Sequence, residues 1–156
     1  MIKINTILNN KEWYNYIKNP SIFVEKKINK INKNFKKYKD NKIFCTLLLS
    51  GNNEIKKLNK KFRKKNKSTD VLSFPFYNKN QLKKKLQKDK EIYLGDIIIN
   101  LNKIKGKKKE RIDFRLQFNK LWIHGLVHLF GYQHSKDKDY YKMLKIEKDF
   151  LSYLNK

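Results

Sequence analysis

All three histidines of the chain fall within eleven residues, in the sequence H-G-L-V-H-L-F-G-Y-Q-H at positions 124–134. The segment around the first two is apolar on nearly every side, which predicts a helix buried in the core rather than one on the surface. His124 and His128 are four residues apart, so a helix places their side chains on the same face. A helix of this kind has to lie at the centre of the fold.

The third histidine can approach the first two because a glycine follows the helix. Gly131 lies three residues after His128, where a left-handed C-cap would end the helix and turn the chain back. His134 is then free to return toward the helical pair. Three neutral imidazoles suit a zinc ion and leave a fourth coordination position for water. We therefore predict that His124, His128 and His134 bind one Zn²⁺ ion.

Two other kinds of zinc protein share part of this pattern. The spacing H-x3-H-x5-H is also that of metzincin proteases, but in those enzymes a catalytic glutamate follows the first ligand, where this chain has Gly125. A metalloprotease is therefore the least favoured interpretation. A closed structural zinc site would need a fourth protein ligand, such as Cys45 or Asp137.

Glycine inside a helix costs about 1 kcal/mol relative to alanine, which indicates that the sheet or a substrate backbone comes close to Gly125.

Apolar periodicity and turn residues predict the remaining elements. Strands are expected at 2–8, 43–50, 71–76 and 93–100, and helices at 20–36, 53–62, just after residue 100, at 110–130 and at 139–154. Pro75 cannot donate to a strand ladder, so the third strand should lie at an edge. Residues 77–91 contain a run of lysines and are expected to form a solvated, mobile insertion. The order of elements indicates an α+β fold, a mixed sheet of about four strands with about five helices packed on it.

The size and charge of the chain limit its class. With 156 residues, 39% of them hydrophobic, the chain fits one domain, residues 1–156. Its formal net charge of +25 favours a polyanionic partner, because lysines attract phosphates and release the counterions condensed on them. Nearly all these cations are lysine, a bias typical of AT-rich genomes, so charge supports RNA binding without proving it. The first residues, M-I-K-I-N-T-I-L, lack the apolar run of a signal peptide, and no apolar stretch approaches about 18 residues, so we expect a cytoplasmic protein.

Three motifs, in the same order along the chain, resemble the YbeY family of endoribonucleases. They are F-R-K-K-N-K-S-T-D-V-L-S-F-P-F at 62–76, L-G-D-I-I-I at 94–99 and the histidine motif at 124–134. Met143 and Glu147 also fall where the last helix of the family carries these residue types. The resemblance covers about residues 40–150.

The resemblance implies a zinc-dependent endoribonuclease that prefers single strands, forms the 3′ end of 16S rRNA and takes part in ribosome quality control. Its partners would be rRNA and the small ribosomal subunit, with neither membrane nor DNA involved. Arg63 matches an arginine important for activity and would clamp a phosphate, since its planar fork meets two oxygens at once. The metal would activate water or polarise a phosphate oxygen. A non-enzymatic, rRNA-binding assembly factor with a structural zinc is the alternative.

Five further residues are candidates for supporting roles. Lys64, Lys65 and Lys67 would steer RNA toward the metal, although solvated loop charges explain them equally well. Asp70 and Asp96 are candidates for proton transfer or for orienting a metal ligand. Each lies at a strand boundary, where a turn or cap hydrogen bond is an equally good explanation.

Two positions depart from the family pattern. Gln133 stands where the family usually has an aspartate, and it offers a neutral amide in place of a carboxylate. This change would weaken the orientation of a metal ligand or remove a proton acceptor. Lys120 stands where the family often has a histidine.

Overall fold

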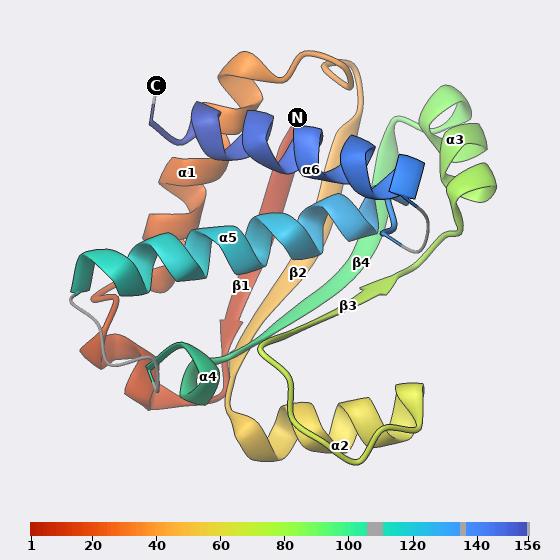
Figure 1. Ribbon diagram of the computed structural model, residues 1–156. Helices are drawn as coiled ribbons and strands as arrows, with labels where there is room; N and C mark the ends of the chain where they lie inside the picture. Colours follow the sequence, from red (N-terminus) through yellow and green to blue (C-terminus); the bar gives the residue numbers. More distant parts are fainter. Residues whose placement is uncertain (106–110, 135–136, 156) are drawn as a thin grey trace.

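The computed structural model describes residues 1–105, 111–134 and 137–155 (Figure 1). In chain order, the elements are β1 (Ile2–Leu8), a 3₁₀ helix (Lys11–Asn15), α1 (Pro20–Asn34), β2 (Lys42–Ser50), α2 (Asn52–Arg63), β3 (Val71–Pro75), α3 (Lys79–Lys88), β4 (Glu91–Asn100), α4 (Leu101–Lys105), α5 (Arg111–Leu129) and α6 (Asp137–Tyr153). Every predicted strand and helix is confirmed, with ends within two residues of those expected. The break expected at Gly106 and the lysines after it lies outside the described residues.

The four strands form one mixed sheet in the order β1-β2-β4-β3. β1 pairs in parallel with β2, and β2 with β4, whereas β3 runs antiparallel to β4. β3 is therefore an edge strand, in agreement with Pro75, which has no N–H to donate to a further neighbour. The α+β fold predicted from the sequence is confirmed.

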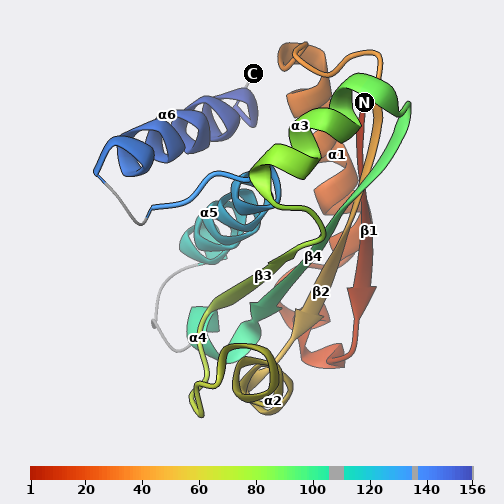
Figure 2. The same ribbon diagram turned by 90° about the vertical axis from the view of Figure 1, so that its right-hand side faces the viewer.

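The helices are distributed unequally over the two faces of the sheet. α1, α5 and α6 lie on one face, with α5 between the sheet and α6, and α2 packs at one end of the other face (Figures 1 and 2). Burial on two sides explains why the C-terminal half of α5 is apolar almost all round. Its fully buried side chains are Phe118, Trp122, Ile123, Leu126 and Val127. None of the helices in the described part of the chain has the length and apolar character that a membrane crossing requires.

The expectation of a mobile insertion at 77–91 was wrong, because this segment contains α3. The helix begins with a capping box, in which the Asn78 side chain accepts from Gln81 N at 2.9 Å and the Gln81 side chain accepts from Asn78 N at 3.0 Å. Leu82 is buried, and the side-chain amide of Asn41 donates to two carbonyl groups near the end of the helix. The run of lysines led to the wrong prediction, because this helix buries only one narrow side.

The sheet approaches α5 most closely at Gly125. A Cβ atom at this position would lie 2.6 Å from Ile97 Cγ2 and 3.1 Å from Ser73 Oγ. Both neighbours belong to strands, and Ile97 is fully buried, so neither can move away easily. Of the two explanations that the sequence left open for this glycine, the structure supports close approach of the sheet.

We expect Gly125→Ala to destabilise the metal-free protein by about 1 kcal/mol. Forcing a methyl group into a filled core costs about 1–3 kcal/mol, whereas the higher helix propensity of alanine contributes about 1 kcal/mol in the opposite direction. Urea unfolding in the presence of a chelator measures the difference without the stabilising effect of bound metal.

Ile97→Ala provides the control, because it removes the side-chain atoms that the new methyl group would meet. In a double-mutant cycle, Gly125→Ala should cost less in the Ile97→Ala background than in the wild type. Strictly additive free energies of unfolding would show that the two residues do not restrict each other.

Candidate metal centre

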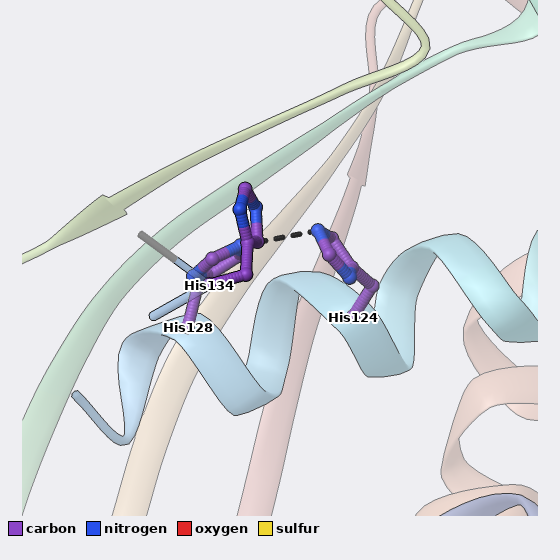
Figure 3. Close-up of side chains that lie close together, drawn as sticks. All are labelled: His124, His128 and His134. Carbon is purple, nitrogen blue, oxygen red and sulfur yellow. Dashed lines mark hydrogen bonds between the residues drawn. The ribbon is translucent and has the colours of Figure 1, made fainter. Parts of the chain in front are cut away.

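Three histidine side chains converge at the C-terminal end of α5 and the turn after it (Figure 3). Taking one ring nitrogen from each, the three atoms lie within 4.8 Å of one another. His124 and His128 come from consecutive turns of α5, and His134 returns from the turn beyond Gly131. Gly131 has a φ of 83°, the left-handed conformation that the spacing predicted, and its N–H donates to the carbonyl oxygen of His128 at 2.9 Å.

Hydrogen bonds determine which nitrogen of the two helical histidines faces the centre. His128 Nδ1 lies 2.9 Å from the carbonyl oxygen of Tyr132, which can only accept, so this nitrogen carries the proton. His124 Nδ1 lies 2.7 Å from a carboxylate oxygen of Glu147, which also accepts. Both Nε2 atoms are left with their lone pairs, 3.1 Å apart. Two lone pairs at this distance repel each other unless a proton or a metal cation lies between them.

The arrangement fits a tetrahedral metal ion. Zn–N distances of about 2.0–2.1 Å place two ligand nitrogens about 3.3 Å apart in a tetrahedral site, close to the 3.1 Å between the Nε2 atoms of His124 and His128. The hydrogen bonds to Glu147 and Tyr132 hold the rings in this orientation, as the partners of metal-binding histidines usually do. His134 is exposed, so the cluster opens to solvent on its side.

The electrostatics of the cluster also favour a cation. Burial, followed by the neighbouring His124 and His134, lowers the pKa of His128 to about 4. The ring is therefore neutral at pH 7, and only a neutral imidazole offers a lone pair to a metal. His128 can accept an ion at this pH without first releasing a proton.

Arg63 lies across a pocket of about 280 Å³ from two of the histidines. The pocket is lined by Arg63, Ser73, Pro75, His128, Gln133 and His134. Arg63 stands at the end of α2, and its Nη2 donates to the carbonyl oxygen of Ser73 on β3 at 3.3 Å. Arg63, which was predicted to bind phosphate, thus faces the same cavity as the predicted metal ligands His128 and His134, from which it is distant in sequence. Gln133 also lines this cavity.

The structure does not bring the three predicted lysines to this pocket. Lys64, Lys65 and Lys67 are exposed, and none of them lines the cavity at the histidines. Lys64 ends α2 in the left-handed conformation with a φ of 58°, and the carbonyl oxygen of Lys67 accepts from the Asn59 side chain at 2.8 Å. Their positions suit solvated loop charges, and a role in steering RNA stays a prediction.

Asp70 lies beside the cluster. Its carboxylate accepts from Val71 N at 2.9 Å and from the Thr69 hydroxyl at 3.2 Å, as expected for a turn residue. It also lines a second pocket, of about 530 Å³, together with His124 and Glu147. Asp70 therefore lies near the histidine cluster, although none of the side-chain hydrogen bonds found among the described residues joins it to a histidine.

Asp96 faces the opposite side of the sheet. Its carboxylate accepts from the hydroxyl group of Tyr93 at 2.6 Å. The next residue, Ile97, points toward Gly125 of α5, and side chains alternate along a strand, so Asp96 points away from the histidines. The structure does not support the predicted role of Asp96 in proton transfer or ligand orientation at this site.

Of the two candidates for a fourth protein ligand, Cys45 does not complete the cluster. Cys45 is buried in β2, where burial, with a smaller effect of Asp96, raises the pKa of its thiol to about 12. The group of possible metal ligands found among the described residues consists of the three histidines and includes neither a cysteine nor a carboxylate. The side chain of Asp137 lies outside the described residues.

Glu147 is the contact that local sequence reasoning missed. It comes from α6, and it supports His124 from the side opposite the cluster. The one indication in the sequence was that Glu147 falls where the last helix of the YbeY family carries a glutamate. Spacing alone could not assign it, because the packing of α6 on α5 brings the two residues together.

The chain is similar to known proteins over almost its full length. The family model described as Endoribonuclease YbeY matches residues 7–155. A protein of Pelagibacter ubique named Endoribonuclease YbeY is 46% identical in an alignment of 151 positions that covers 94% of this chain and 92% of that protein. A protein of Ehrlichia canis with the same name is 38% identical in an alignment of 157 positions that covers 99% of this chain and 93% of that one.

A solved structure supports the fold. The solution structure of a Thermotoga maritima protein aligns with a TM-score of 0.61 and covers 99% of this chain and 89% of that one, at 24% sequence identity. At this identity the likeness concerns the fold alone. The family match and the two relatives are independent of it, and they establish that this chain belongs to the YbeY family, whose model is described as Endoribonuclease YbeY.

Proposed function

We propose that this protein is a zinc-dependent endoribonuclease that cleaves single-stranded RNA. The observation that carries the proposal is the pair of Nε2 lone pairs of His124 and His128, held 3.1 Å apart, with Arg63 facing the same pocket as His128 and His134. Membership in a family whose relatives are named endoribonucleases supports RNA as the substrate.

Zinc is the proposed metal because the ligands are neutral nitrogen donors. Three imidazoles are a ligand set typical of catalytic zinc sites, and they leave the full charge of the ion available to the substrate. When bound, the ion would polarise a phosphate oxygen and lower the pKa of a water molecule. Glu147 and Tyr132 keep the protons on the Nδ1 atoms of His124 and His128, so that both Nε2 atoms remain available to the ion.

Arg63 and Gln133 would position the phosphodiester. The guanidinium group uses one N–H for Ser73, and its other N–H groups can meet two phosphate oxygens at once. Gln133 lines the same pocket and offers an amide N–H to a phosphate oxygen, where a carboxylate would repel it. In this arrangement the loss of the aspartate usual in the family favours substrate binding, while ligand orientation rests on Glu147 and Tyr132.

Membership in the YbeY family is the basis for a more specific proposal about the biological substrate. We propose that the enzyme forms the 3′ end of 16S rRNA, acts in ribosome quality control and associates with the small ribosomal subunit. The formal net charge of +25 is consistent with a partner as rich in phosphate as the ribosome.

Two rival functions make different demands on the site. A non-enzymatic assembly factor with a structural zinc would need a fourth protein ligand, and the described residues provide three. A metalloprotease would need a base after the first ligand, but Gly125 has no side chain and faces the sheet. The three-ligand site with Arg63 beside it favours the nuclease.

We expect His128→Ala to lose both zinc and RNA cleavage. Removing a ligand should lower zinc affinity by more than the roughly 10–100-fold that loss of a supporting hydrogen bond costs. Metal analysis and cleavage of a single-stranded RNA measure the two effects, and circular dichroism checks that the variant is folded. Cleavage that persists without bound metal would contradict the proposed chemistry.

We expect Arg63→Ala to lower the cleavage rate by roughly 10²-fold or more while zinc content stays unchanged, since one charged phosphate donor is lost. Arg63→Lys should recover only part of the rate, because a lysine keeps the charge without the planar fork. Arg115→Ala is the matched control, as this arginine is exposed and lies over the Phe23 ring. Equal rates for Arg63→Ala and Arg115→Ala would remove Arg63 from the mechanism.

We expect Glu147→Gln to lower zinc affinity by about 10–100-fold. Glutamine has the same shape and can still accept from His124 Nδ1, but it lacks the negative charge that strengthens the imidazole as a ligand. Competition with a zinc chelator measures the affinity, and Asp149→Asn, on the same helix, controls for the change in net charge. Unchanged affinity in Glu147→Gln would show that the contact does not tune the site.

A further inference from the structure

Two further pockets lie between the pocket at Arg63 and the length of α3. One of them, of about 390 Å³, shares Gln133 with the pocket at Arg63 and the histidines. The other, of about 560 Å³, shares Lys79, Asn80 and Tyr132 with the 390 Å³ pocket. We call these two pockets together the α3 groove. Gln133 lies between one end of this groove and the histidines.

The walls of the α3 groove are held in place by packing. On one side, α3 is anchored by its capping box and by Leu82, which is 2% exposed. On the other side stands the turn after α5, where a Cβ atom on Gly131 would lie 3.3 Å from the Cα atom of Lys79. The turn that returns His134 to the metal centre therefore also abuts the start of α3. The groove and the metal centre share one supporting segment.

The lining of the α3 groove is strongly basic and partly aromatic. Four lysines line its two pockets, against the single carboxylate of Asp139: Lys37, Lys79, Lys83 and Lys142. Lys79 and Lys83 are four residues apart and so point from the same face of α3. The aromatic part includes Tyr38, whose ring is stacked on that of Phe130 with centroids 5.6 Å apart.

We infer that the α3 groove binds the single strand of RNA on one side of the cleavage site. The inference rests on the proposed nuclease function, and it assigns the path of the substrate. The lysines complement the phosphates, and Tyr132, which lines both pockets, provides an aromatic side chain on which a base can stack. Both pockets have the volume of sites that hold small ligands, and a base can enter one only when it is unstacked, which excludes a duplex.

Two pairs of substitutions on one helix test the inference. Lys79→Gln with Lys83→Gln removes two cations from the α3 groove. Lys84→Gln with Lys88→Gln removes two exposed lysines that do not line it. Both pairs change the net charge equally, and glutamine and lysine have similar helix propensities, so α3 should persist in each.

Binding of the zinc-loaded protein to a single-stranded RNA is measured over a range of salt concentrations. Each lost phosphate contact should reduce the slope of log Kd against log salt by about 0.7–1 for a single strand. We therefore expect the groove pair to reduce the slope by about 1–2 and the control pair to leave it close to the wild-type value.

Equal salt slopes for the groove pair and the control pair would overturn the inference. It would also be overturned if the binding of duplex RNA depended on the groove lysines as much as the binding of single-stranded RNA does. Either result leaves the proposed function standing if the wild type cleaves single-stranded RNA. Absence of cleavage by the zinc-loaded wild type would instead refute the proposed function. The two failures are thus distinguishable, because one is read from binding slopes and the other from cleavage.

Discussion

The close packing of α5 against the sheet at Gly125 is the contact on which the rest of the structure depends. It allows one helix to be both the centre of the core and the base of the histidine cluster. Apolar residues of α5 face the sheet and α6, while His124 and His128 lie on a face that borders α6 at Glu147 and the edge strand β3. Because the helix is buried on two sides, its histidines are held by the packing of the whole fold. A preorganised metal site requires this kind of rigidity.

Three neighbouring segments add the remaining residues around the two histidines of α5. α6 brings the carboxylate of Glu147 to His124, the turn at Gly131 returns His134, and the end of α2 brings Arg63 to the edge strand β3. Each of these contacts joins residues from different elements. α3 extends the same region into a basic groove, so the lysine-rich segment of the chain is a wall beside the metal centre and not a loose insertion.

The predictions from sequence succeeded where a pattern is local. Helical spacing placed His124 and His128 on one face, and the glycine at 131 predicted the left-handed turn that is observed. They failed at α3, where a run of lysines outweighed the one buried leucine and the capping residues. For Asp96 they left a supporting role and a local hydrogen bond as alternatives, since a strand boundary does not reveal which face of the sheet a side chain will occupy.

The sequence by itself determined the order of the elements, the edge position of β3, the histidine triad and the resemblance to a family of ribonucleases. Periodicity, turn chemistry and ligand spacing act over a few residues, so they can be read along the chain. Only the tertiary structure decided that Glu147 supports His124, that Arg63 faces the histidines and that pockets with shared lining residues lie between the histidines and α3. These contacts unite residues distant in sequence, and the physical reason is that packing of helices on a sheet, rather than local preference, sets which surfaces meet.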